Sequence, residues 1–221
     1  MSAERGTWNQ ESKAALVCFA LKEEAGAFRK RVTADGTVSI LVTGMGRENT
    51  RRTLLERLEQ ARPAFVLTCG FAGGLDPRLA SGEVLFATED STLNAKLIAA
   101  GAKLAKFHCG SRIATTIAEK IELRRATGAD AVEMESETVH QVCRERGIPC
   151  ATVRVISDTA NENLPLDFNQ LSKPDLSLDF GKLFCAIANS PGKIPALLRL
   201  QKNCSTAADR LAVVLMKVVA E

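Results

Sequence analysis

Acidic side chains follow three apolar segments of the chain, at the points where buried strands would end. Glu24 follows the first segment, Glu133 and Glu135 follow the second, and Asp158 follows the third. Ligands of α/β proteins bind at the carboxyl ends of strands, so these carboxylates are candidates for one site. There a carboxylate can accept protons from substrate hydroxyls or pass a proton to a leaving group.

Each of these residues also has a purely structural explanation. Glu23 and Glu24 would be favoured in the first turn of a helix by its dipole, and Asp158 would suit a helix cap or a turn. The glycine-containing segments at residues 44–46 and 69–75 are predicted to be tight turns. Neither matches G-x-G-x-x-G or the P-loop pattern, so no dinucleotide or nucleoside triphosphate site is expected.

Short strand-like runs alternate with longer helical patterns, which predicts one α/β domain at residues 14–221 with a mixed β-sheet flanked by helices. Residues 1–13 are expected to be a flexible tail. The first two strands are continuously apolar and should be buried on both faces. The predicted strands are residues 14–20, 38–43, 64–68, 83–88, 107–113 and 150–156, and the predicted helices are residues 47–61, 94–105, 115–127, 180–188 and 194–221. Residues 131–135 are expected to lead from a short extended piece into a further helix that runs to Arg146.

Composition argues against several classes of partner. Of the 221 residues only 5% are aromatic, none of them tyrosine, and the net charge is +3 with both signs interspersed, so no nucleic acid is expected to bind. No apolar run approaches the roughly 18 residues of a membrane span, so no stable membrane insertion is expected. The 7 cysteines are dispersed and only 2 histidines could join them, which favours reduced thiols, a cytoplasmic location and no metal site.

Five segments, taken in order, resemble a known family. They are Ala20-Leu21-Lys22-Glu23-Glu24, Thr43-Gly44-Met45-Gly46, Cys69-Gly70-Phe71-Ala72-Gly73-Gly74-Leu75, Val132-Glu133-Met134-Glu135 and Arg154-Val155-Ile156-Ser157-Asp158. The set spans roughly residues 15–168 and is similar to the purine nucleoside phosphorylase and uridine phosphorylase superfamily. Within it, the segments are most similar to the methylthioadenosine/S-adenosylhomocysteine nucleosidase branch. The resemblance implies a nucleoside phosphorylase-like fold.

The resemblance also implies an enzyme that cleaves the N-glycosidic bond of an adenine-type purine nucleoside with a 5′ substituent. Such cleavage passes through an oxocarbenium-like sugar, so the leaving base must be protonated and the cation stabilised. By resemblance, Asp158 assists protonation of the base at N7, Glu135 binds the ribose 2′ and 3′ hydroxyls, and Glu24 activates water toward C1′. The other substrate-binding residues that it implies are Met134, Glu133, Ser157, Phe71, Ala72, Gly73 and Gly46.

A useful base at Glu24 must not have its pKa depressed by a neighbouring cation, so Lys22 is expected to point elsewhere. No cofactor is implied. The implied partners are a small-molecule nucleoside and further copies of the chain, in a homodimer or a hexamer.

Two other functions stay open. Phosphorylases of the superfamily carry arginines in the first loop and near the glycine segment, where this chain has Lys22-Glu23-Glu24 and Phe65-Val66-Leu67. A pair of carboxylates repels phosphate, although Arg47 could still reach an anion, and inorganic phosphate would then be the second substrate. The chain could also be a catalytically inactive nucleoside-binding protein.

Departures from the nucleosidase pattern concern the substrate. Phe71 replaces a small polar residue, and residues 109–118 lack the expected Phe-containing stacking motif. Between Glu89 and Asn94 the chain is too short for a loop over the 5′ substituent, so an open 5′ channel is expected unless residues 164–178 cover it. Residues 191–200 resemble the tail of hopanoid-associated members, thought to remove adenine from an adenosylated lipid intermediate. The alternative is an amphipathic helix that packs on the sheet or on a sister subunit.

Overall fold

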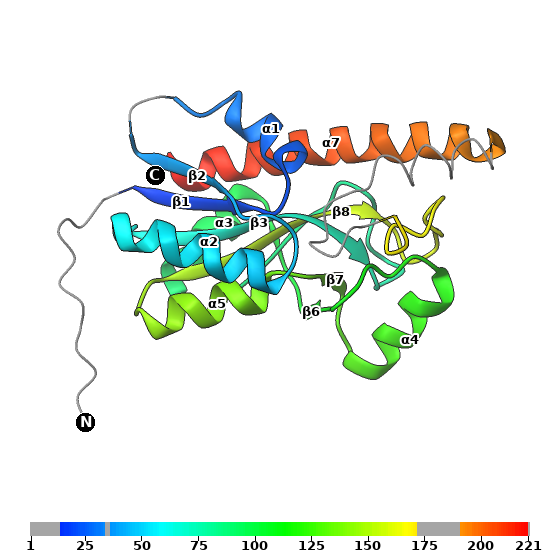
Figure 1. Cartoon of the computed structure of the whole chain (residues 1–221), viewed down its shortest axis with the longest axis horizontal. Helices are drawn as coiled ribbons and strands as arrows, with labels where there is room; N and C mark the ends of the chain where they lie inside the picture. The colour runs from blue at the N-terminus through cyan, green and yellow to red at the C-terminus, as the bar shows by residue number, and fades with distance from the viewer. Residues whose placement is uncertain (1–13, 34–35, 172–190, 221) are drawn as a thin grey trace.

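The structure, a computed structural model, describes residues 14–33, 36–171 and 191–220 (Figure 1). The expected tail at residues 1–13 and the expected helix at residues 180–188 lie outside the described residues. The strands are β1 (Ala15–Phe19), β2 (Val38–Val42), β3 (Phe65–Gly74), β4 (Val84–Thr88), β5 (Lys103–Leu104), β6 (Phe107–Cys109), β7 (Ala131–Glu133) and β8 (Cys150–Asp158). The helices are α1 (Lys22–Arg29), α2 (Arg47–Gln60), α3 (Ser91–Ala100), α4 (Ile117–Thr127), α5 (Ser136–Glu145), the short 3₁₀ turn η1 (Pro191–Lys193) and α7 (Ile194–Val219).

The strands of the described residues form one mixed sheet, which confirms the α/β fold class. Its main path runs β2-β1-β3-β8-β4-β5. From β2 to β8 the neighbouring strands are parallel, whereas β4 is antiparallel to β8 and β7 is antiparallel to the end of β3. Because β1, β3 and β8 are parallel, their carboxyl ends meet at the same edge of the sheet.

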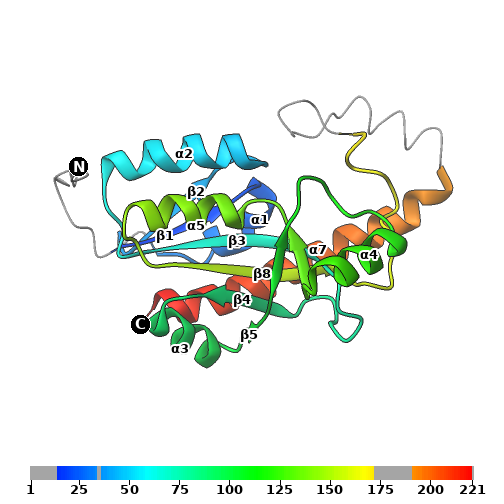
Figure 2. The ribbon, with the colours of Figure 1, turned by 90° about the horizontal axis from the view of Figure 1, so that it is seen from below.

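Helices cover both faces of this sheet, with α2 and α5 on one face and α3 and α7 on the other (Figure 2). Helix α1 packs into the same core as α7 through Ala25 and Phe28. On β1, Leu16 and Cys18 pack into the core beneath α2 and α5, while Val17 and Phe19 pack into the core beneath α7. This alternation follows from the two-residue period of a strand. It explains why a continuously apolar run is buried on both faces, as predicted for β1.

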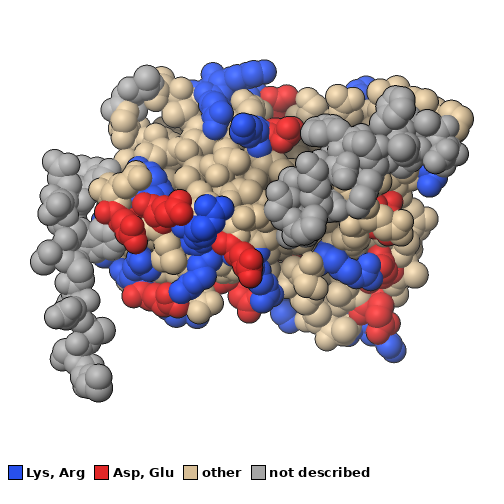
Figure 3. Space-filling view, viewed as in Figure 1, with Lys and Arg blue, Asp and Glu red and all other residues tan. Residues whose placement is uncertain are grey.

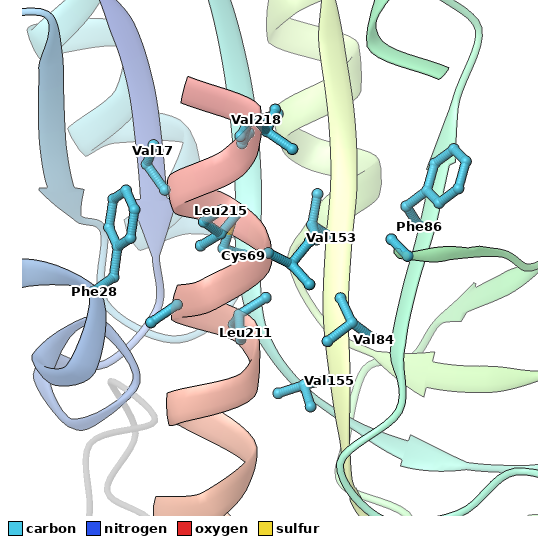
Figure 4. Packing of buried hydrophobic residues seen from close by; sticks show 14 of the residues in the cluster. Val17, Phe28, Cys69, Val84, Phe86, Val153, Val155, Leu211, Leu215 and Val218 are labelled. Atoms are coloured by element: carbon cyan, nitrogen blue, oxygen red, sulfur yellow. The ribbon is translucent and has the colours of Figure 1, made fainter. Parts of the chain in front are cut away.

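Helix α7 supplies much of the core on its face of the sheet. Leu211, Leu215 and Val218 recur at helical spacing, and they lie between β1 and β8 in Figure 4, with Val17 on one side and Val153 on the other. From Ala207 onward, α7 is therefore an amphipathic helix that packs on the sheet. Its first turns extend beyond the sheet, past the end of β8 (Figure 1).

Two predictions about the strands are wrong. Residues 69–74 do not form a tight turn but continue β3, because they pair with β8 along one side and with β7 along the other. The strand β2 is not buried on both faces, because it lies at the edge of the sheet and its residues are only half-buried. The helix expected at residues 94–105 begins earlier, where the Asp90 side chain caps it, and ends at Gly101 in a left-handed conformation.

The surface formed by α2 and α5 carries charges of both signs, which are interspersed in Figure 3. Ion pairs join the two helices, from Arg47 to Glu137 at 2.8 Å and from Arg51 to Glu145 at 3.7 Å. This face has no stripe of one sign that would follow a nucleic-acid backbone. Within the residues that the structure describes, no helix is long and apolar enough to cross a membrane.

Candidate active site

The side chains of Glu24, Glu135 and Asp158 line one pocket, which confirms the prediction that they converge. The cavity has a volume of about 240 Å³. Glu24 follows β1 and Asp158 ends β8, so the parallel sheet alone brings these two together. Glu135 joins them because β7 pairs with Gly73 and Gly74 at the end of β3.

Glu24 is buried in the first turn of α1. Its Oε1 accepts a hydrogen bond from the backbone N–H of Phe71 at 2.9 Å, and its Oε2 accepts one from the backbone N–H of Leu21 at 3.0 Å. Burial raises the pKa of Glu24 to about 7, against the opposing charge of Arg154. Lys22 is exposed, as expected. A carboxylate with this pKa can accept a proton near neutral pH.

A fully buried arginine connects the acidic residues. Arg154 Nη2 lies 2.7 Å from Glu133 Oε2 and 3.3 Å from Glu135 Oε2, and it donates to Thr68 Oγ1 at 3.2 Å. Burial disfavours the charge of Arg154, but the carboxylates of Glu133, Glu135 and Glu24 raise its pKa. A guanidinium removed from water is tolerated only with such partners.

Glu133 holds this arginine in place. Its side chain is 0% exposed, its Oε2 accepts the backbone N–H groups of Glu135 at 3.0 Å and Ser136 at 2.9 Å, and its Oε1 accepts the Ser136 hydroxyl at 2.5 Å. Burial alone would raise the pKa of Glu133, but Arg154 and Ser136 hold it below the ordinary value. Glu133 thus positions Arg154 and the start of α5. It also lines the pocket, and its expected part in substrate binding stays a prediction.

Glu135 is less tightly held and has room for a further partner. Its Oε1 lies 3.5 Å from the backbone N–H of Gly46, and its Oε2 lies 3.3 Å from Arg154. Burial raises the pKa of Glu135 although Arg154 opposes this. Gly46, which is expected to bind substrate, contacts Glu135, and its neighbour Met45 lines the pocket.

Gly70 allows Glu24 and Arg154 to meet above β3. The pairing of β3 with β8 places Gly70 directly beside Arg154. A Cβ atom at residue 70 would lie 2.5 Å from Glu24 Oε1 and 2.6 Å from Arg154 Nη1. With a φ of 152°, the residue also has a backbone conformation that favours glycine. This glycine therefore serves a close approach of buried charges.

Asp158 is held through both of its oxygens. The Ser157 hydroxyl donates to Oδ1 at 2.6 Å, and Lys120 Nζ donates to Oδ2 at 2.5 Å. Lys120 is 0% exposed and lies on α4, whose first turn is closed by a capping box between Thr116 and Glu119. The pocket-facing carboxylate thus has a buried cation behind it.

The remaining residues expected to bind substrate line the same pocket; they are Met134, Ser157, Phe71, Ala72 and Gly73. Sequence reasoning missed others on its wall, namely Met45, Arg112, Ile113, Phe168, Leu200 and Cys204. It also missed the roles of Arg154 and Lys120. Each stands at a position that its element buries, one inside an apolar strand and one on the inward side of a helix. A charged residue at a position expected to be buried indicates a buried partner of opposite charge, and this sequence signal could have identified both residues.

The connection between β4 and α3 is as short as the sequence predicts, and residues from 164 onward lie at the pocket. Strand β4 ends at Thr88 and α3 begins at Ser91, so no loop is inserted there. Leu164 and Phe168 line the pocket, and the Asn169 amide binds the backbone N–H and C=O of Ile113, each at 2.9 Å. The first part of residues 164–178 therefore packs against the pocket, and residues 172–178 lie outside the described residues.

Comparisons with known proteins connect this site to a family. The family model described as "Phosphorylase superfamily" matches residues 21–103 and 91–189. A 5′-methylthioadenosine/S-adenosylhomocysteine nucleosidase of Marinomonas sp. (strain MWYL1) is 28% identical over 171 residues, 62% of this chain and 74% of that protein. An aminodeoxyfutalosine nucleosidase of Campylobacter jejuni is 24% identical over 64% of this chain and 77% of that protein.

Solved structures share the fold. A 5′-methylthioadenosine/S-adenosylhomocysteine nucleosidase from Colwellia psychrerythraea, in complex with adenine, superposes with a TM-score of 0.69 at 17% identity and covers 95% of this chain and 96% of that one. Together the two family matches run from the residue before α1 to beyond β8, and they include Glu24, Glu135 and Asp158. The chain therefore belongs to the phosphorylase superfamily.

Proposed function

We propose that this enzyme is a nucleosidase that hydrolyses the N-glycosidic bond of an adenine-type purine nucleoside carrying a 5′ substituent. The observation that carries the proposal is the convergence of Glu24, Glu135 and Asp158 around one pocket. Three carboxylates there match the three needs of the reaction, which are a base for water, a partner for the ribose and an acid for the leaving group. The nucleosidases among the relatives support the same reaction.

In this mechanism Glu24 takes a proton from a water molecule while the water oxygen bonds to C1′. The bond between C1′ and N9 breaks, its electron pair stays with the base, and Asp158 supplies a proton at N7. Each Glu24 oxygen accepts one backbone hydrogen bond and keeps a lone pair for the water. Burial supplies the raised pKa that lets Glu24 act as a base near neutral pH.

Glu135 is the proposed ribose partner. Its two oxygens have only the long contacts to Gly46 and Arg154, so both can accept the hydroxyl groups of a ribose. A carboxylate in this position also faces the positive charge that develops on the sugar. Met134 lies on the same wall and can pack against the sugar ring. The base would lie near Asp158, with the aromatic rings of Phe71 and Phe168 available on the wall.

Water rather than phosphate is the proposed nucleophile, because a phosphate near C1′ would face the carboxylates of Glu24 and Glu135. Arg47, which could have supported phosphorolysis, pairs with Glu137 at 2.8 Å and is not among the residues that line the pocket. Arg112 does line the pocket, but it pairs with Glu119 at 2.5 Å. Phosphorolysis and loss of activity are the alternatives that the next measurement decides.

Base release by the purified protein should not depend on inorganic phosphate. The assay follows free adenine from 5′-methylthioadenosine, S-adenosylhomocysteine and aminodeoxyfutalosine, with and without phosphate, and identifies the sugar product. The free sugar is expected in both buffers. Accumulation of a ribose 1-phosphate would make the protein a phosphorylase, and bound but uncleaved nucleoside would make it a binding protein.

The rate should fall on the acid side of about pH 7, because Glu24 with a pKa of about 7 is protonated there and no longer a base. A pH profile of kcat/KM for the wild type checks this, with an expected decrease of about tenfold per pH unit below that point. Glu23→Gln, on the same helix turn but exposed, is the matched control and should keep the profile. A profile that stays level from pH 5 to pH 8 would remove Glu24 from the role of base.

The wall contributed by Ile113, Leu164, Phe168 and Leu200 supports an apolar 5′ substituent, since covering such a wall gains roughly 25 cal/mol per Å². Which substituent it takes, and whether the likeness of residues 191–200 to hopanoid-associated members extends to substrate, stay predictions. So do the cytoplasmic location and the assembly as a homodimer or hexamer.

A further inference from the structure

A buried lysine contacts the proposed general acid, and the mechanism above does not use it. Lys120 Nζ donates to Asp158 Oδ2 at 2.5 Å, to the Thr159 carbonyl at 2.7 Å and to the Glu162 carbonyl at 2.9 Å. The side chain is 0% exposed. An ammonium group has three protons, and each of them has an acceptor here. These three acceptors suit the ammonium form of the Lys120 side chain.

This arrangement limits how Asp158 can serve as an acid. Both of its oxygens accept hydrogen bonds, from the Ser157 hydroxyl at 2.6 Å and from Lys120. These two donors suit the ionised carboxylate, and an ionised Asp158 must obtain a proton before it can protonate a base. Of its two donors only Lys120 carries a positive charge, and only Lys120 becomes neutral when it gives up a proton.

We propose that Lys120 is a positioning residue that holds, at Oδ2 of Asp158, the proton that Asp158 passes to the leaving base. The proposal rests on the N-glycosidase function proposed above. As the bond between C1′ and N9 breaks, the proton moves from Lys120 Nζ to the Asp158 carboxylate, and the carboxyl group protonates N7. Lys120 is left as a neutral amine and regains a proton from solvent after the base departs. The backbone carbonyls of Thr159 and Glu162 keep the amine beside Asp158.

Other titratable groups face this pair. Cys204 on α7 lies toward Asp158 and Glu24, and burial together with these carboxylates raises the pKa of the Cys204 thiol to about 11. It stays neutral over the useful pH range. Glu24, across the pocket, titrates near pH 7 and sets the acid side of the profile. The Glu162 carboxylate is turned to the Thr159 backbone N–H at 2.9 Å. Cys204 and Glu24 therefore do not account for a difference at alkaline pH between the wild type and a Lys120 variant.

The test is the pH dependence of Lys120→Met. Without the stored proton, Asp158 must be protonated from solvent, which becomes rarer as pH rises. The ratio of wild-type to variant kcat/KM for adenine release is expected to be below about threefold at pH 5.5 and above about tenfold at pH 8. Lys106→Met is the matched control, because Lys106 is exposed and contacts the Thr127 carbonyl at the other end of α4. It should leave the ratio near one at both pH values.

A ratio that is the same at every pH would overturn the proposal, because a lysine that only supports the fold would lower the rate uniformly. Should Lys120→Met not fold, the comparison moves to Asp158→Asn and the double variant Asp158→Asn/Lys120→Met, in which both charges are absent. A lysine that acts only through Asp158 adds no further loss in the double variant, and a further loss would contradict the proposal. Failure of the proposed function is distinct, because the wild type would then release no base at any pH.

Discussion

Replacing Asp158 by asparagine is expected to slow adenine release about a hundredfold to ten-thousandfold, because an amide cannot pass a proton to the leaving base. The change is isosteric, so the pocket keeps its shape and binding of the nucleoside should persist. The measurement is single-turnover cleavage of 5′-methylthioadenosine beside a binding assay with the same compound. A folded variant with full activity would remove Asp158 from the role of acid.

The same substitution is also expected to lower the free energy of unfolding. Asp158→Asn takes away the only carboxylate within 4 Å of the buried Lys120 ammonium in the described part of the chain. Breaking a buried ion pair on one side typically costs about 3–5 kcal/mol. Chemical denaturation therefore accompanies the kinetics, with Asp209→Asn as control, since its pair with Arg31 is exposed. The double variant with Lys120→Met removes the unpaired charge and should recover part of the lost stability.

Arg154→Met is expected to lower the free energy of unfolding by about 3–5 kcal/mol at neutral pH, because it leaves buried carboxylates without their cation. Glu133 loses the contact at 2.7 Å and Glu135 loses the contact at 3.3 Å. Glu24 loses the positive charge that lowers its pKa. Denaturant unfolding of the variant and the wild type measures the difference. Arg47→Met, which removes an exposed pair with Glu137, is the control and should change stability by less than about 1 kcal/mol.

The effect of Arg154→Met should depend on pH in a defined direction. In the wild type the pKa of Glu133 lies below its ordinary value of 4.5, so Glu133 contributes stability above pH 4.5 that is lost as pH falls through the lowered value. The variant lacks this contribution. The difference in free energy of unfolding between the wild type and the variant should therefore become smaller as the pH is lowered below about 4.5. A difference that is constant with pH would mean that Arg154 stabilises the fold through packing and not through charge.

Sequence reasoning located the acidic residues of the site because local patterns carry that information. The apolar runs before Glu24 and Asp158 end where strands end, and parallel strands bring such ends to one edge. The same reasoning misread residues 69–74 as a turn, since glycines in a strand resemble turn residues until their neighbours are known. A glycine is needed at position 70 because the side chains of Glu24 and Arg154 approach it closely. These residues are far apart in the chain, so local sequence does not indicate the approach.

Sequence also left the partners of each carboxylate undecided. Three glutamates and one aspartate were candidates for the site, and the fold gives each of them different partners. Glu133 has short contacts to Arg154 and to the start of α5, whereas Glu135, two residues later, has only long contacts to Gly46 and Arg154. Lys120 could not be assigned to Asp158 because it lies 38 residues earlier in the chain.

The amino-acid sequence by itself determined the α/β class, the order of most strands and helices, and the carboxylates that surround the pocket, because periodicity and strand ends are local properties. Tertiary structure alone decided which carboxylates are free for substrate, since this depends on the buried cations of Arg154 and Lys120. It also decided the pKa of Glu24, because burial by other elements raises it to about 7. A charge removed from water takes its properties from the groups packed around it, and only the fold specifies those groups.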